Sequence, residues 1–168
     1  MGLSVIAQMT GNQEWLPVAE SRAESVISAG YGLYTTTMGR ATLALIAIEK
    51  GDLVAAEQLY SELAEVPGFM VFYVNTDRIL GLLSVTLGRL NQAVSHFEDA
   101  LKFNRTAGYR PDLAWTCYDY ADALLKREND GDHDTAAKFI DEALALSQEL
   151  DMRPLMERVL SRREILKA

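Results

Sequence analysis

The chain is 168 residues long, carries a formal net charge of −8 and is 49% hydrophobic, and this length predicts one domain with a continuous core. The acidic balance, without any basic stripe, disfavours nucleic acid as a direct partner. No apolar run approaches the ~18 residues of a membrane span and the start lacks a secretory signal, so we expect a cytoplasmic protein with no membrane partner.

Helix is the expected secondary structure along the whole chain. Alanine and leucine cost little to place in a helix, and only 4 prolines interrupt the sequence. A partial or capping hairpin is expected over residues 1–32, with a helical remnant at 5–9 and a turn at Gly11-Asn12. Apolar spacing and the punctuating glycines and prolines predict further helices over residues 15–29, 37–50, 53–64, 69–87, 91–107, 111–127, 135–150 and 154–166.

These helices fall into repeated hairpins within a single domain, residues 1–168. Two kinds of small residue recur at the same pair of intervals, the turn glycines Gly51, Gly88 and Gly131 and the helix alanines Ala56, Ala93 and Ala136. Agreement between two independent markers makes a chance pattern improbable. The predicted units are residues 33–68, 69–110 and 111–152, followed by a C-terminal capping helix over 153–168.

The middle unit resembles a tetratricopeptide (TPR) repeat, which expects Leu-Gly in its first helix, a turn glycine, and small, aromatic and small positions along its second. The matching residues are Leu80, Gly81, Gly88, Leu90, Ala93, Phe97, Ala100 and Leu101. The intervals exceed the usual ~34 residues of the motif. The resemblance implies an all-α fold, a right-handed superhelical stack of antiparallel helical hairpins (a TPR-like α-solenoid), in which Gly81, Ala93 and Ala100 let two helices approach closely.

The C-terminal segment over residues 122–160 shows a second likeness. Its sequence, DALLKRENDGDHDTAAKFIDEALALSQELDMRPLMERVL, resembles the helical regions of large bacterial signalling proteins. Those proteins join a signal-transduction ATPase to a LuxR-like DNA-binding domain or a nucleotidyl cyclase domain. This resemblance implies a sensing or scaffolding role, with any enzymatic activity outside this chain.

The sequence offers no set of catalytic or metal-ligating residues. Asp130, Asp132 and Asp134 alternate like the first ligands of an EF-hand, but Thr135 stands where the loop needs glycine, so a solvated turn with Asp134 as helix N-cap is expected. Cys117 has aromatic neighbours and predicts a reduced, packed thiol. We therefore expect a protein that is not an enzyme and that has no metal site and no cofactor.

The candidate partner-binding positions are those that face inward from the first helix of each hairpin, because these helices line the concave face of such a stack. Asn75 and Arg78 are the strongest candidates, since polar groups on an apolar helix are costly if they are buried alone. An alternative interpretation is that some of these side chains cap or bridge neighbouring helices. The full set is Met38, Thr42, Glu49, Asn75, Arg78, Thr116, Asp119, Tyr120 and Arg127.

Three functions follow from this reading. The favoured one is a protein–protein interaction module that binds a peptide or a partner domain in its concave groove. The second is a sensor or regulatory region of a multidomain bacterial transcriptional or signalling regulator. The third is a self-associating scaffold, a homo-oligomer formed through the apolar ends of the stack.

Overall fold

The fold contains eight helices and two short strands within residues 13–167, the part of the chain that the computed structural model describes. This confirms the predicted all-α class apart from one small hairpin. The predicted remnant helix at 5–9 and the turn at Gly11-Asn12 lie outside the described residues. The elements are α2 (Leu16–Ala29), α3 (Leu33–Lys50), α4 (Leu53–Leu63), β1 (Met70–Val71), β2 (Val74–Asn75), α5 (Thr76–Thr86), α6 (Leu90–Ala107), α7 (Arg110–Arg127), α8 (Asp132–Glu149) and α9 (Arg153–Lys167).

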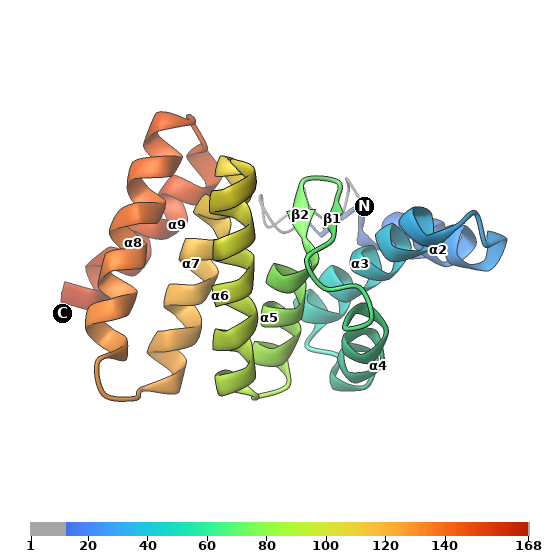
Figure 1. Ribbon diagram of the computed structural model, residues 1–168, viewed down its shortest axis with the longest axis horizontal. Coiled ribbons are helices and arrows are strands. Elements are labelled where there is room, and N and C mark those ends of the chain that lie inside the picture. Colours follow the sequence, from blue (N-terminus) through green and yellow to red (C-terminus); the bar gives the residue numbers. More distant parts are fainter. Residues whose placement is uncertain (1–12, 168) are drawn as a thin grey trace.

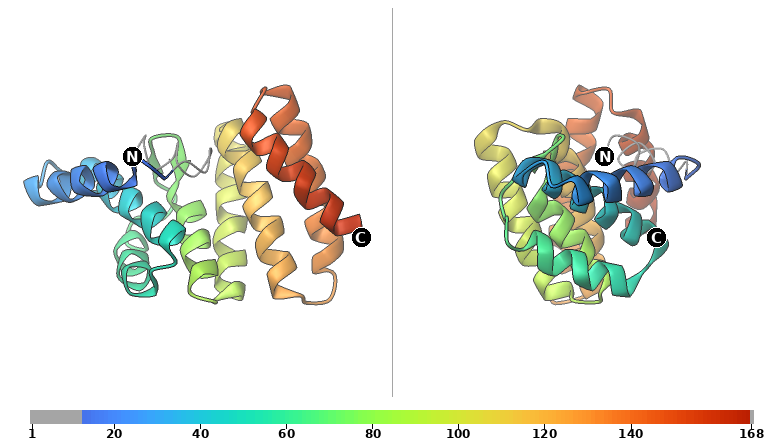
Figure 2. Two further views of the ribbon diagram at one scale, coloured as in Figure 1. Left: turned by 180° about the vertical axis from the view of Figure 1, so that it is seen from behind. Right: turned by 90° about the vertical axis from the view of Figure 1, so that its right-hand side faces the viewer.

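Each helix packs against the next one in the sequence. In Figure 1, α5, α6, α7 and α8 stand side by side, and successive helices run in opposite directions. The chain thus progresses from α2 at one end of the molecule to α8 and α9 at the other, as the two further views in Figure 2 also show. Helices that are neighbours in the sequence are therefore neighbours in space.

The turn between α3 and α4 shows how local sequence sets this arrangement. Gly51 ends α3 with a φ of 63°, a left-handed conformation that glycine adopts without steric cost. Asp52 then begins α4, and its side chain accepts hydrogen bonds from the backbone N–H groups of Val54 and Ala55. The observed bounds of most helices agree with the predicted ones to within about one turn.

The predicted helix over residues 69–87 is wrong at its start. The chain instead forms an antiparallel pair of two-residue strands, β1 and β2, and α5 begins only at Thr76. The Asn75 side chain caps α5 by accepting from the Asp77 N–H at 2.7 Å, and the Thr76 N–H donates to the Phe69 carbonyl at 2.9 Å. These local bonds satisfy backbone groups that a continuous helix would have paired differently.

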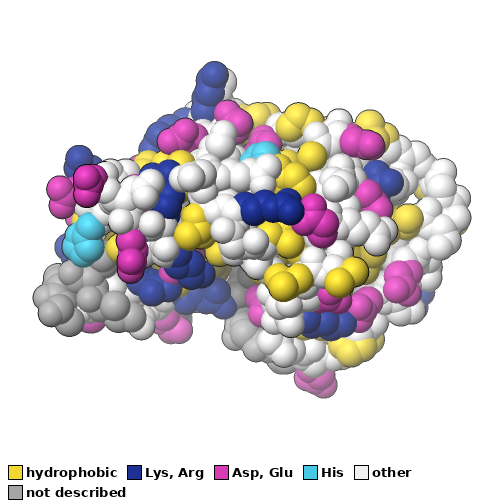
Figure 3. Space-filling view, turned by 90° about the horizontal axis from the view of Figure 1, so that it is seen from below, with side chains coloured by type: hydrophobic (Ala, Val, Ile, Leu, Met, Phe, Trp, Pro, Cys, Tyr) yellow, Lys and Arg dark blue, Asp and Glu magenta, His cyan; other side chains and the backbone are white. Residues whose placement is uncertain are grey.

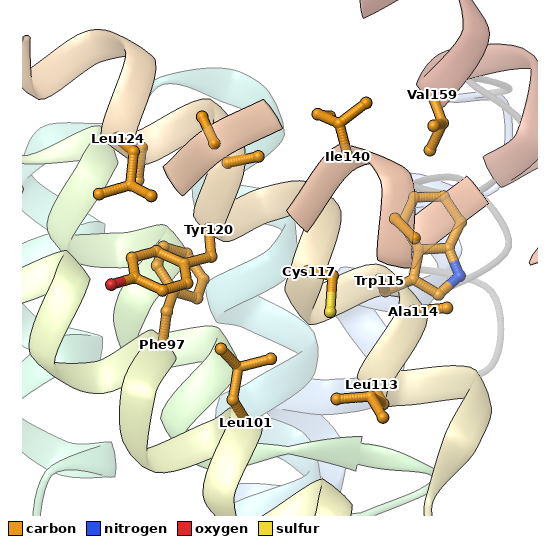
Figure 4. Packing of buried hydrophobic residues seen from close by; sticks show 14 of the residues in the cluster. Phe97, Leu101, Leu113, Ala114, Trp115, Cys117, Tyr120, Leu124, Ile140 and Val159 are labelled. Atoms are coloured by element: carbon orange, nitrogen blue, oxygen red, sulfur yellow. The ribbon is translucent and has the colours of Figure 1, made fainter. Parts of the chain in front are cut away.

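Two apolar clusters make up most of the core. One joins α3, α4, the hairpin and α5, and the other joins α6, α7, α8 and α9. In the second cluster the ring of Phe97 lies against that of Tyr120, with centroids 5.9 Å apart, and the fully buried Cys117 belongs to the same cluster (Figure 4). The predicted packed thiol is confirmed, and burial raises the pKa of Cys117 far above its ordinary value.

Candidate functional site

Most of the predicted partner-binding side chains are covered by protein. Met38 and Arg127 are half-buried, Asp119 is 10% exposed, and of the nine only Glu49 is open to solvent. The other five are buried: Thr42, Asn75, Arg78, Thr116 and Tyr120. The predicted set is thus divided between interior and surface.

Asn75 and Arg78 do not fit the solvated groove that the sequence predicted for them. Asn75 is 0% exposed and Arg78 is 2% exposed. Asn75 caps α5, and Arg78 connects α5 to α7, so the alternative interpretation of capping and bridging holds for both. Most polar atoms of these two side chains find partners inside the stack, so their presence on an apolar helix needs no solvated surface. Nδ2 of Asn75 and Nη2 of Arg78 have no partner among the described residues.

Arg78 lies at the centre of a buried network of charged and polar side chains. Its Nε donates to Oδ2 of Asp119 at 2.8 Å, and its Nη1 donates to Oδ1 of Asp112 at 3.3 Å. The other oxygen of Asp112 accepts from the Asn75 N–H at 3.1 Å and from Nδ2 of Asn104 at 2.9 Å. The hairpin, α5, α6 and α7 are therefore joined through one carboxylate.

The pKa values in this network depend on burial and on the presence of two carboxyl groups for one guanidinium. Burial raises the pKa values of Asp112 and Asp119, and the Arg78 guanidinium opposes that rise in both. Burial alone would lower the pKa of Arg78, but the two carboxylates outweigh it and raise that pKa. One guanidinium is thus shared by two carboxyl groups.

A pocket of about 140 Å³ lies between the β1–β2 turn and the start of α7, and Arg78 and Asp112 of this network line it. The turn and the α6–α7 connection lie on the same edge of the molecule (Figures 1 and 2). The surface of the pocket is almost entirely apolar. We call it the hairpin pocket, and its lining residues are Phe72, Tyr73, Val74, Arg78, Pro111, Asp112 and Trp115.

Two hydrogen-bond donors on the lining residues of the hairpin pocket have no partner among the described residues. They are Nη2 of Arg78 and Nε1 of Trp115, and both atoms are buried. Two guanidinium groups lie over the Trp115 ring, that of Arg78 at 5.6 Å from the ring centroid and that of Arg158 at 5.5 Å. A buried donor without an acceptor costs free energy, so these atoms mark a place where an acceptor would be stabilised.

Of the predicted set, Tyr120 lines a second and more open depression of about 580 Å³ between α6 and α8. Its hydroxyl donates to Oε1 of Glu98 at 3.0 Å. Charged groups of both signs, Glu98, Lys102 and Arg105, surround an apolar floor. Mixed charge is also seen on the face that includes the turns after α5 and α7, where acidic and basic side chains are interspersed (Figure 3). Neither surface favours a partner of one charge.

The acidic turn before α8 holds an ion pair. Asp132 accepts from Nε of Arg127 at 2.9 Å and from its Nη2 at 2.6 Å, so this predicted partner-binding arginine is engaged within the chain. The predicted N-cap Asp134 is corrected, because α8 begins at Asp132 and Gly131 precedes it. Across the described part of the chain, no three His, Cys, Asp or Glu side chains are grouped so as to hold a metal ion.

His96 links α6 to α4 through a hydrogen bond to Tyr60. Nε2 of Gln92 donates to the Tyr60 hydroxyl oxygen at 2.8 Å, so the Tyr60 O–H is free to donate to Nε2 of His96 at 2.7 Å. Burial lowers the pKa of His96, which Asp77 and Asp99 only partly oppose. An imidazole that accepts this bond must lack a proton on Nε2.

We expect the free energy of unfolding to fall as the pH is lowered from ~7.5 to ~5.5, through the ordinary pKa of histidine. The unfolded chain then binds a proton at His96 that the folded chain does not, because the folded pKa is depressed. Urea titrations at both pH values measure the effect, and His96→Gln is the control. The pH-dependent loss should be smaller in this variant, and an equal loss in both proteins would contradict the assignment.

Sequence reasoning missed the hairpin pocket because it placed Phe72 and Tyr73 inside a helix. The run Val71-Phe72-Tyr73-Val74 is rich in β-formers, and this was the available signal. No Asn-Gly or Asp-Gly pair marks the turn, so the usual signal of a two-residue hairpin is missing.

In the described part of the chain, no helix combines the length and the apolarity that crossing a membrane requires.

Comparison with known proteins adds no family to this geometry, since no protein-family model matches the chain and no curated protein matches it.

Proposed function

We propose that this chain is a non-enzymatic protein–protein interaction module that binds a peptide or a partner domain at the hairpin pocket. The observation that carries the proposal is the pair of aromatic side chains at the β1–β2 turn. Phe72 is 47% exposed and Tyr73 is 76% exposed, and both line an apolar pocket. Exposed aromatic residues beside such a pocket are typical of the few positions that supply most of the binding energy of an interface.

The backbone of the turn supports the same proposal. Phe72 and Tyr73 have φ angles of 48° and 68°, in the left-handed region that disfavours bulky side chains. Each residue costs on the order of 1 kcal/mol or more in this conformation relative to an unstrained one. Glycine or asparagine would form the turn at lower cost, so two aromatic residues here are explained by a role for their rings.

We further infer that the helices form the right-handed TPR-like stack to which the sequence is similar. The regular packing of each helix on its successor supports this inference. So does the recurrence of left-handed glycines at Gly51, Gly88 and Gly131. In this arrangement the β1–β2 strand pair is an addition to the middle helical unit and is held by the helices of that unit. The sensor region of a larger regulator and the self-associating scaffold stay as alternative predictions.

The decisive variant is Phe72→Asn combined with Tyr73→Gly. Asn-Gly is the preferred pair for a two-residue turn with two positive φ angles, so the hairpin is kept or stabilised while both rings are removed. We expect partner recovery to fall by at least about tenfold in affinity-capture experiments followed by quantitative mass spectrometry, because interface anchors each contribute about 2 kcal/mol or more.

The matched control replaces another exposed apolar pair, Leu53→Asn with Val54→Asn at the start of α4. These side chains are 58% and 82% exposed and lie outside the pocket. We expect this variant to recover the same partners as the unmodified chain. Equal recovery by the Phe72→Asn/Tyr73→Gly variant would show that the hairpin pocket is not the interface.

A further inference from the structure

We propose that the hairpin pocket takes one large apolar or aromatic side chain of a peptide together with a neutral carbonyl oxygen, which accepts a hydrogen bond from Nη2 of Arg78. This inference rests on the proposed function and names the chemistry that the same site recognises. It comes from three properties of the pocket: its size, its unpaired donors and its charge.

The size of the pocket matches one ring. A volume of about 140 Å³ with an almost wholly apolar surface is available between the β1–β2 turn and α7. An apolar cavity of about 150 Å³ stays dry and binds benzene in another protein. The pocket is therefore too small for a folded helix and large enough for a single leucine, phenylalanine or similar side chain.

The unpaired groups at the pocket call for an acceptor. Nη2 of Arg78 and Nε1 of Trp115 are both donors without a partner among the described residues. The acceptor that lines the pocket, Asp112, is already engaged, because its Oδ1 accepts from Arg78 and its Oδ2 accepts from Asn75 and Asn104. A ligand that offers only donors would leave Nη2 of Arg78 and Nε1 of Trp115 without a partner.

The charge of the site excludes an ionic ligand. An anion would approach Asp112, which lines the pocket, while the charge of Arg78 is already shared by two carboxylates. A cation would meet the guanidinium of Arg78, which lines the pocket, and the donors without a partner. Both would also lose hydration in an apolar pocket, which is costly without a partner. A neutral carbonyl beside an apolar group, the chemistry of a peptide bond and its side chain, satisfies all three properties.

The test compares four probes that share one ring: toluene, benzamide, benzoate and benzylammonium. The readout is the indole N–H resonance of Trp115 in ¹H–¹⁵N spectra of the intact chain. The chain has 2 tryptophans, and Trp15, which does not line the pocket, serves as the internal reference. We expect benzamide to bind about tenfold more tightly than toluene, the gain of a hydrogen bond from a charged donor, and the two ions to bind more weakly than benzamide.

Each other ranking overturns the inference. Equal affinities for toluene and benzamide would show that the Arg78 donor does not recognise a carbonyl oxygen. Tightest binding by benzoate or benzylammonium would show that the pocket prefers an ion to a neutral ligand. No movement of the Trp115 resonance with any probe would show that the pocket takes no ring. None of these results affects the partner-capture test with Phe72→Asn/Tyr73→Gly, so the two proposals fail separately.

A second arm identifies the source of the ligand. N-acetylphenylalanine methylamide carries the same ring with two peptide carbonyls, and we expect it to displace benzamide and to shift the Trp115 resonance in the same way. Benzamide binding without binding of this peptide analogue would assign the pocket to a free small molecule and overturn the peptide proposal. Arg78→Lys, which keeps the charge and removes the fork of donors, should abolish the difference between benzamide and toluene.

Discussion

Replacing Arg78 with leucine is expected to lower the free energy of unfolding by about 3–5 kcal/mol, the usual cost of removing one partner from a buried ion pair. The side chains of Arg78 and Asp112 are each 2% exposed, and Asp119 is 10% exposed. Leucine fills much of the volume but leaves two carboxyl groups without their counter-charge in the interior. Chemical denaturation monitored by circular dichroism measures the loss.

The matched control is Arg105→Leu, because Arg105 forms an ion pair with Glu142 on the surface. Half of its side chain is exposed, and such pairs are worth between 0 and about 1 kcal/mol. Combining Arg78→Leu with Asp119→Asn should restore part of the stability, because one buried carboxylate is removed with the guanidinium. If Arg78→Leu cost no more than Arg105→Leu, the network would not hold α5 to α7.

Arg78 contributes both to the stability of the fold and to the proposed binding site, through different nitrogen atoms. Its Nε and Nη1 donate to the two carboxylates, and Nη2 is the nitrogen without a partner among the described residues. The ion pairs fix the guanidinium in place before a ligand arrives, so little conformational entropy is lost on binding. A loss of binding in an Arg78 variant would by itself confuse stability with recognition. For this reason Arg78→Lys is judged only by the difference between benzamide and toluene on the same protein, and the turn variant tests the interface.

The helices were predictable because their signals are local. Apolar spacing, the left-handed glycines and the small residues of the middle unit all lie within a few turns of the element that they specify. Gly51 and Asp52, for example, end one helix and begin the next using only their own backbone and side-chain atoms. Such signals need no knowledge of the tertiary structure.

The candidate site was not predictable in the same way, because its contacts are distant in the sequence. Arg78 pairs with residues 34 and 41 positions away. An isolated arginine on an apolar helix predicts a solvated groove as long as its buried partners are not known. The hairpin was missed for a different reason, since its turn consists of Phe72 and Tyr73, residues that rarely occupy positive φ angles.

Gly81→Ala is expected to destabilise the chain by about 1–3 kcal/mol, the cost of overpacking a filled core. A Cβ atom at Gly81 would lie 2.7 Å from Cε1 of Phe97 and 2.8 Å from two other atoms of that ring. Phe97 is fully buried and packs against Tyr120, so moving the ring would disturb that packing. The sequence predicted a small residue here for close helix approach, and this contact between α5 and α6 confirms it.

Whether Gly81→Ala stabilises or destabilises the chain shows which is larger, the gain in helix propensity or the cost of overpacking. Alanine favours a helix interior over glycine by up to about 1 kcal/mol, so local propensity alone would make Gly81→Ala stabilising. In a Phe97→Leu background the ring is gone, and the same substitution should become neutral or favourable. Ser84→Ala in α5 is the control: its hydroxyl is buried without a partner among the described residues, so losing it should cost little. A stabilised Gly81→Ala single variant would mean that α5 and α6 can separate at little cost, and that the close contact is not what requires glycine.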